Sequence, residues 1–129
     1  MKAKTPVEVS CKLSRWQLIK RQLRNLHLYD FLEKAAHVEK PILLDVRTPE
    51  EYAQGHLPEA INLDYLGADF IDSLEKLPKD ATYFVYCRSC RRSTRVCVNL
   101  LHTGFSEVFN LDGGLCSYPD MLTKVIIST

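Results

Sequence analysis

Short apolar runs alternate with stretches of helical spacing along most of this chain. The apolar runs are typical of strands, and they occupy residues 26–28, 42–46, 60–63, 82–86 and 107–110. Helical stretches lie between them, at residues 31–36, with Asp30 as the expected N-cap, and at residues 50–54, 67–77 and 93–103. Strands that alternate with helices pair in parallel through right-handed crossovers. The sequence therefore predicts an α/β fold in which helices flank a five-stranded parallel sheet.

The distribution of charge divides the chain into two parts. Residues 1–24 hold seven lysines and arginines against one glutamate, a net charge of +6, and this leaves −5 for the rest of a 129-residue chain whose total is +1. A chain of this length that is 46% hydrophobic can bury one core of its own. We therefore predict a basic N-terminal extension at residues 1–24, followed by a single domain at residues 25–129.

Two periodicities follow one another within the extension. Val7, Val9, Cys11 and Leu13 alternate with polar residues, and the apolar residues from Leu13 to Leu23 then recur at helical spacing, so a strand and an amphipathic helix are expected. The apolar face could pack on the acidic domain of the same chain. Alternatively, the basic face could bind a protein partner that is acidic, or an anionic membrane surface. The basic residues are not interleaved with aromatic ones, so no nucleic-acid partner is predicted.

One cysteine stands directly behind an apolar strand. Cys87 follows residues 83–86 and opens a stretch that contains four arginines, Arg88, Arg91, Arg92 and Arg95. In open α/β sheets, ligands bind at the carboxyl ends of the strands. The backbone N–H groups of such a loop and the N-terminus of the helix behind it favour a thiolate and an anionic substrate. Cys87 is therefore the candidate nucleophile. Three other cysteines are expected to be structural or incidental, namely Cys11, Cys97 and Cys116.

The length of the loop separates two chemistries. A cysteine phosphatase needs a loop that encloses a tetrahedral phosphate, with an arginine six positions after the cysteine. In this chain Ser93 occupies that position, and Arg92 comes one residue earlier. The tighter loop is better matched to a single sulfur atom carried on Cys87, so a phosphatase is the least favoured interpretation.

Three blocks of sequence stand in an order and spacing that are typical of a known family. They read LLDVRTPEEYAQGHLPEAIN at residues 43–62, CRSCRRS at residues 87–93, and GF followed by NLDGG within residues 104–114. Together they resemble the single-domain rhodaneses, sulfurtransferases whose loop reads Cys-Arg-x-Gly-x-Arg-Ser. The resemblance implies the three-layer rhodanese-like fold for residues 25–129. It also implies that Cys87 takes sulfur as a persulfide from thiosulfate or a similar sulfane-sulfur donor, and passes it to a thiol or cyanide-like acceptor.

The resemblance gives roles to the residues around Cys87. The small anionic donor is expected to bind the loop residues Arg88, Ser89, Cys90, Arg91 and Arg92. Among these, Arg88 and Arg92 would guide the donor and Arg91 would face solvent, while the backbone N–H groups would stabilise the thiolate and persulfide anions. The loop is expected to be supported by Asp45, Arg47, Ser93, Gly113 and Gly114.

Two positions depart from the family pattern. Tyr118 replaces a tryptophan, and Cys90 replaces the loop glycine. A side chain at a position of positive φ costs about 1 to 2 kcal/mol, so one alternative is a binding module with weak or no turnover. A second alternative is a thiol-redox protein, in which Cys90 is a resolving thiol three positions after Cys87. In the ordinary interpretation, Cys90 only fills the place of the glycine.

The remaining features argue against other classes of protein. No apolar stretch approaches the roughly 20 residues that span a bilayer, and the N-terminus lacks the apolar run of a secretory signal. The five cysteines are odd in number and irregularly spaced, which favours a reducing compartment. No pair of histidines or carboxylates has the spacing of metal ligands. We therefore expect a cytoplasmic protein without a transmembrane segment, a metal or another cofactor.

Overall fold

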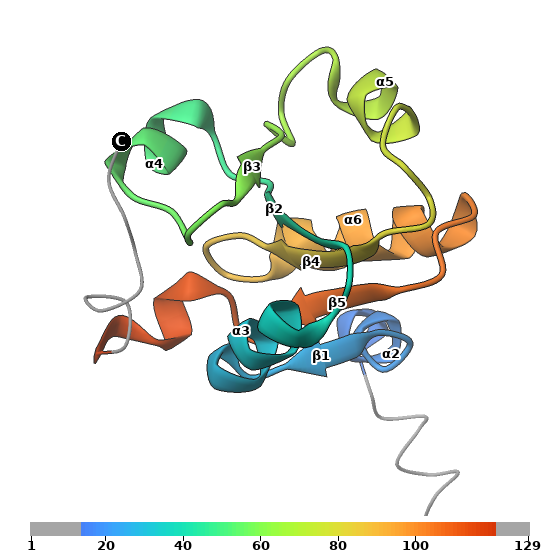
Figure 1. Ribbon diagram of the computed structural model, residues 1–129. Coiled ribbons are helices and arrows are strands. Elements are labelled where there is room, and N and C mark those ends of the chain that lie inside the picture. Colours follow the sequence, from blue (N-terminus) through green and yellow to red (C-terminus); the bar gives the residue numbers. More distant parts are fainter. Residues whose placement is uncertain (1–13, 121–129) are drawn as a thin grey trace, which may run out of the picture.

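The computed structural model describes residues 14–120, which fold around one parallel sheet (Figure 1). The strands are β1 (Arg24–Leu26), β2 (Pro41–Asp45), β3 (Ile61–Asn62), β4 (Thr82–Tyr86) and β5 (Val108–Leu111). Their order in the sheet is β1-β5-β4-β2-β3, and every neighbouring pair is parallel. The predicted five-stranded parallel sheet is confirmed, with β4 as its central strand.

Helices cover both faces of the sheet. They are α2 (Arg15–Lys20), α3 (Leu28–His37), α4 (Pro49–Gln54), α5 (Phe70–Glu75) and α6 (Arg91–His102), and a short 3-10 helix, η1, follows β5 (Leu115–Ser117). Buried residues of α5 and α6 form one apolar cluster with the sheet, and buried residues of α3 form another. The expected three-layer arrangement is therefore confirmed (Figure 1). Within residues 14–120, no helix is long and apolar enough to cross a membrane.

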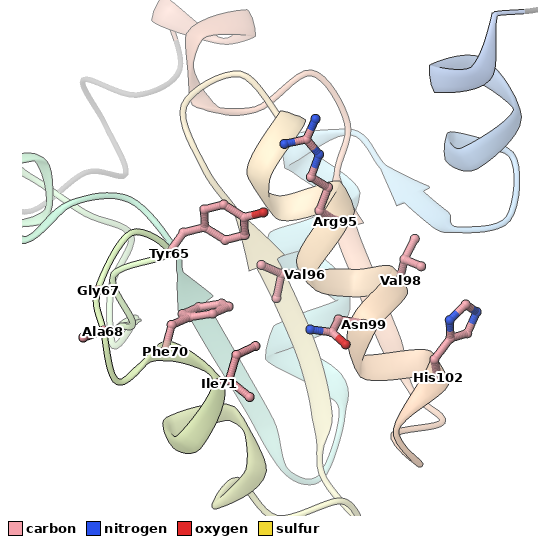
Figure 2. A pocket seen from close by; sticks show the side chains of 10 residues that line it. All are labelled: Tyr65, Gly67, Ala68, Phe70, Ile71, Arg95, Val96, Val98, Asn99 and His102. Carbon is pink, nitrogen blue, oxygen red and sulfur yellow. The ribbon is translucent and has the colours of Figure 1, made fainter.

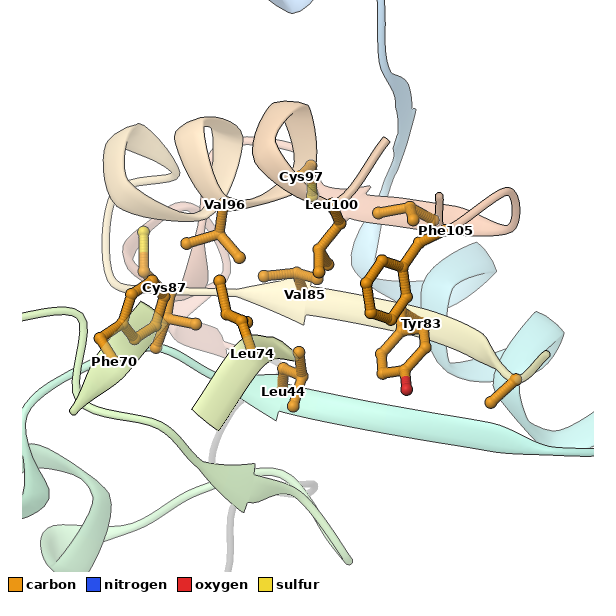
Figure 3. Packing of buried hydrophobic residues seen from close by; sticks show 13 residues of the cluster. Leu44, Phe70, Leu74, Tyr83, Val85, Cys87, Val96, Cys97, Leu100 and Phe105 are labelled. Carbon is orange, nitrogen blue, oxygen red and sulfur yellow. The ribbon is translucent and has the colours of Figure 1, made fainter. Parts of the chain in front are cut away.

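The central strand supplies side chains to both clusters. Tyr83 and Val85 point to the face covered by α5 and α6, and Phe84 and Tyr86 point to the opposite face. Figure 3 shows the first of these clusters around β4. Cys87 continues the alternation of Tyr83 and Val85, so its side chain is directed toward α6.

The helix α3 begins earlier than predicted, and Asp30 is not its N-cap. The N-cap is His27, whose Nδ1 accepts a hydrogen bond from the Tyr29 N–H at 3.2 Å. Asp30 lies in the first turn, where the positive end of the helix dipole stabilises a carboxylate. The strand predicted over residues 26–28 ends at Leu26, because Leu28 is already the first residue of α3.

Other element boundaries also differ from the predictions. The helix predicted over residues 67–77 is shorter, because Gly67 lies in a turn in which its N–H donates to the Asp64 carbonyl at 2.9 Å. The helix predicted from residue 93 begins at Arg91, because the Cys90 carbonyl already accepts a hydrogen bond from the Thr94 N–H at 3.0 Å. The last strand lies one residue further along the chain than predicted.

The N-terminal extension contributes one described helix. Ser14 forms a capping box with Gln17 at the start of α2, and the helix packs against α6. Leu23, which follows α2, packs against the apolar cluster beneath α6. The predicted strand in the first 13 residues lies outside the described part of the chain. β1 begins at Arg24, and the domain boundary placed before Asn25 stays a prediction.

Candidate active site

Cys87 directly follows β4, the central strand of the sheet. Its side chain is only 3% exposed and forms part of the floor of a pocket of about 460 Å³. This pocket, which we call the Cys87 pocket, is lined by Arg47, Thr48, Glu51, Cys87, Arg88, Ser89, Arg91 and Arg92. The position expected for Cys87 agrees with the structure, and its role as a nucleophile stays a prediction.

Ser93 contacts the sulfur of Cys87 through both its backbone and its side chain. The Ser93 N–H donates to Cys87 Sγ at 3.4 Å, and the Ser93 hydroxyl lies 3.5 Å from the same sulfur. The hydroxyl also donates to the Cys90 carbonyl at 3.2 Å. Because Ser93 lies in the first turn of α6, the positive end of this helix is directed at the sulfur. This arrangement brings the N-terminus of α6 into contact with the sulfur of Cys87.

The loop after Cys87 surrounds the pocket with positive charge. Arg88, Ser89 and Arg91 are exposed at the pocket, and Arg92 is half-buried there. The side chains of Arg88 and Arg92 make no ion pair with any residue between 14 and 120. They can therefore bind an anionic ligand without first breaking an internal contact.

Cys90 is the one predicted loop residue that does not line the pocket. It adopts the left-handed conformation, with a φ of 68°, and its side chain is 5% exposed. Burial and then the charge of Asp112 raise the pKa of Tyr118, and Cys90 adds to this effect. The predicted contact of Cys90 with the donor and its role as a resolving thiol remain untested.

The conformation of Cys90 predicts an unusual order of stability between two variants. Cys90→Gly should be more stable than Cys90→Ala by about 1 to 2 kcal/mol, because only glycine adopts this φ without strain. Cys97, which is buried inside α6, is the matched control. There the glycine variant should be the less stable of the two by about 1 kcal/mol. Urea denaturation of the four variants measures both differences, and the same order at both positions would contradict the prediction.

Gly114 packs directly against the loop that carries Cys87. The Leu115 N–H donates to the Cys87 carbonyl at 3.0 Å, and the Cys116 N–H donates to the Arg88 carbonyl at 2.9 Å. A Cβ atom on Gly114 would lie 2.6 Å from the Cys90 nitrogen and would also clash with the Arg88 carbonyl. Gly114 therefore supports the loop from behind. Gly113 instead packs against the Ser117 side chain, and neither glycine lines the pocket.

Gly114→Ala should therefore displace the loop. We expect a loss of stability of about 2 to 4 kcal/mol, from a strained φ and from overpacking, together with loss of any activity that depends on Cys87. Gly104→Ala is the matched control, since Gly104 also has a positive φ but a Cβ there would meet only the flexible end of Lys79. Urea denaturation measures the loss of stability, and an assay of that activity measures the second effect. Equal behaviour of the two variants would show that the contact with Arg88 is unimportant.

Asp45 and Arg47 form a buried ion pair at the end of β2. The two nitrogens Nε and Nη2 of Arg47 donate to the Asp45 carboxylate at 2.9 and 2.7 Å, and Nη2 also donates to the Gly55 carbonyl at 2.6 Å. Burial on its own would lower the pKa of Arg47, but the hydrogen bonds and charge of Asp45 outweigh it and leave that pKa raised. The Asn62 amide donates to the carbonyls of both residues. Arg47 is therefore held rigidly in the pocket wall.

Two residues of the pocket were not predicted as part of the site. Thr48 and Glu51 line the Cys87 pocket and form the capping box that begins α4. The Glu51 N–H donates to Thr48 Oγ1 at 3.3 Å, and the Thr48 N–H donates to Glu51 Oε1 at 3.2 Å. The spacing Thr-x-x-Glu is a sequence signal for such a box. This signal identifies the start of the helix, but it gives no information about whether the helix faces Cys87.

The other described cysteines lie outside the pocket. Cys97 is buried in α6, and burial, followed by the nearby Cys87, raises the pKa of its thiol. This agrees with the expected structural role. Cys116 is exposed in η1. Across residues 14–120, no group of three or more histidines, cysteines and carboxylates is arranged to hold a metal ion.

Comparison with known proteins identifies similar sequences and folds. The model of the rhodanese-like domain matches residues 27–118. The chain is 36% identical over 86 residues to a sulfurtransferase of Allochromatium vinosum, a match that covers 67% of this chain and 78% of that protein. It is also 36% identical over 81 residues to the thiosulfate sulfurtransferase GlpE of Pseudomonas entomophila, with 62% and 72% covered. A rhodanese-like domain protein from Staphylococcus aureus has the same fold, with a TM-score of 0.69 over 83% of this chain and 99% of that chain, at 23% identity.

Proposed function

Because the chain belongs to the rhodanese-like domain family, we propose that it is a sulfurtransferase that carries sulfur as a persulfide on Cys87. Both relatives named above are sulfurtransferases, and one of them is a thiosulfate sulfurtransferase. The observation that carries the proposal is the environment of Cys87 Sγ. This sulfur accepts a hydrogen bond from the N-terminus of α6, and it lies in a pocket lined by four arginines and one glutamate.

The reaction has two halves. The Cys87 thiolate attacks the outer sulfur of thiosulfate, the sulfur–sulfur bond of thiosulfate breaks, and sulfite leaves with the bonding electron pair. The transferred sulfur remains on Cys87 as a persulfide anion. A thiol or cyanide then attacks this outer sulfur, and Cys87 leaves as a thiolate. The second half restores the starting state of the cysteine without an external reductant.

The residues around Cys87 have separate tasks in this proposal. Arg88 and Arg92 attract and orient the anionic donor, and Ser89 and Arg91 complete the wall of the pocket. The backbone N–H groups of residues 88–92, together with the Ser93 N–H, stabilise negative charge on sulfur. The Asp45–Arg47 pair and Gly114 hold the surrounding loops in place.

The proposal is tested by the mass of the protein after exposure to a donor. Reduced full-length protein is incubated with thiosulfate and freed of excess reagent, and its intact mass is measured. The wild type should gain one sulfur atom, and peptide mapping should locate it on Cys87, whereas Cys87→Ser should gain none. A wild type that gains nothing, or a gain that persists in Cys87→Ser, would overturn the proposal.

The positive φ of Cys90 favours one competing function, a binding module whose loop turns over slowly. If the side chain of Cys90 distorts the loop, Cys90→Gly should transfer sulfur faster than the wild type. Equal rates would remove the basis of this alternative.

A thiol-redox function makes a different prediction for Cys90. If Cys90 resolves the persulfide, the thiosulfate-treated wild type should release sulfide and lose two thiols, and Cys90→Ser should do neither. The burial of Cys90 outside the pocket favours the sulfurtransferase instead.

A further inference from the structure

A second pocket lies between α6 and the segment that joins β3 to α5 (Figure 2). Its volume is about 510 Å³, and it shares no lining residue with the Cys87 pocket. Phe70 and Val96 form part of its apolar lining, and both also belong to the buried cluster that contains Cys87. We call it the α5–α6 pocket. It lies on the same face of the sheet as Cys87 but outside the proposed catalytic machinery.

Three polar side chains at the α5–α6 pocket have no partner within the described chain. The hydroxyl of Tyr65, the guanidinium of Arg95 and the amide of Asn99 make no hydrogen bond or ion pair with any residue from 14 to 120. In Figure 2 the Tyr65 hydroxyl and the Asn99 amide are directed into the space between α6 and the facing segment, and Arg95 lies at one end of it. Their hydrogen-bonding capacity is therefore available to a ligand.

The α5–α6 pocket is lined by basic side chains. Arg95 and His102 are its basic side chains, and no aspartate or glutamate is found among its lining residues in the described part of the chain. A guanidinium matches the planar geometry of a carboxylate and can donate two parallel hydrogen bonds to it. A hydroxyl and an amide can add further hydrogen bonds to the same group. The polar rim therefore favours a carboxylate over a neutral or cationic group.

The apolar surface of the pocket requires a second feature in the ligand. Ile71 is 52% exposed at the edge of the pocket, beside Phe70 and Val96. A ligand with an apolar body would remove this side chain from water, which a free inorganic anion cannot do. The same feature separates the site from the Cys87 pocket, whose lining is mostly charged.

We propose that the α5–α6 pocket binds a small carboxylic acid with an apolar body. Its carboxylate pairs with Arg95 and accepts a hydrogen bond from Asn99 or Tyr65, and its apolar body covers Phe70, Val96 and Ile71. The inference does not depend on sulfur transfer at Cys87, because the two pockets share no residue.

Three probes of matched size test the proposal on the full-length, ¹⁵N-labelled protein. They are 3-phenylpropionate, 3-phenylpropanol and 3-phenylpropylamine, which share one apolar body and differ in the charge of the end group. Titrations followed by backbone amide shifts report both the affinity and the location. The propionate should shift Ala68, Val96 and Asn99, and should bind at least threefold more tightly than the alcohol or the amine. Equal binding of the three probes, or shifts confined to residues 88–93, would overturn the proposal.

Two variants separate the contributions of charge and apolar contact. Arg95→Gln should weaken binding of the propionate at least threefold and abolish its preference over the alcohol. Arg21→Gln removes an exposed arginine outside the pocket and should bind all probes as the wild type does. Ile71→Ser should weaken the propionate and the alcohol alike, and its exposure makes the substitution tolerable for the fold. A propionate affinity unchanged in both Arg95→Gln and Ile71→Ser would also overturn the proposal.

Discussion

Cys87→Ala should lower kcat/KM for sulfur transfer from thiosulfate to cyanide by at least about a thousandfold, because the variant has no atom that can carry the sulfur. The thiol is small, and alanine leaves the packing around Val85 and Val96 largely intact. The loss should therefore appear in the rate and not in the urea midpoint. Steady-state assays of thiocyanate formation measure the first quantity, and urea denaturation measures the second.

Cys116→Ala is the matched control for this prediction. Cys116 has an exposed thiol, and it contacts the loop through its backbone N–H, which alanine retains. The variant should keep the rate of the wild type within about twofold, a difference of less than about 0.5 kcal/mol in activation free energy. A Cys87→Ala protein that still forms thiocyanate, or a Cys116→Ala protein that has lost the activity, would place the sulfur on a different residue.

Asp45→Asn should lower the free energy of unfolding by about 3 to 5 kcal/mol. The Asp45 side chain is fully buried, and the substitution leaves the guanidinium of Arg47 without a counter-charge. The same change frees Arg47 in the wall of the Cys87 pocket, so KM for thiosulfate should rise as well. Urea denaturation gives the change in stability, and the dependence of rate on thiosulfate concentration gives KM.

An exposed ion pair in the same molecule provides the comparison. Lys40 and Asp80 lie 2.8 Å apart, with both side chains largely exposed. Asp80→Asn should leave the urea midpoint almost unchanged, because water screens such a pair and solvates the remaining charge. If the two substitutions lowered the free energy of unfolding equally, burial would not explain how much the Asp45–Arg47 pair stabilises the protein.

The spacing of apolar residues predicted most of the fold, because strands and helices each have a characteristic spacing in the sequence. The central strand was predicted over the residues it occupies, since four consecutive large apolar residues from Tyr83 follow a turn. The start of α3 was wrong because the side chain that accepts the capping hydrogen bond belongs to His27, whereas the sequence predicted Asp30. Residue preferences at N-caps favour aspartate over histidine, and only the structure shows that the chain is extended at His27.

The candidate site was predictable only in part. The order strand, cysteine, arginines and helix placed Cys87 at the carboxyl end of a strand, and the structure agrees. The sequence could not tell on which side of the loop Cys90 lies, because this depends on its left-handed conformation. Nor could it show that Thr48 and Glu51 face Cys87, since α4 reaches the loop only through the packing of the whole sheet.

The strand order also determines when this domain can fold during its synthesis. β1 is the first described strand to leave the ribosome, yet its only neighbour in the sheet is β5, the last. The Asn110 amide donates to Asn25 Oδ1 at 2.9 Å across 85 residues of sequence. The pairings of β1 with β5 and of β2 with β4 close long loops, which makes folding slow and leaves strand edges open in an incomplete chain. A nascent chain that ends before Val108 therefore exposes β4 and β1 to association with other chains, and chaperone binding should be greatest at that length.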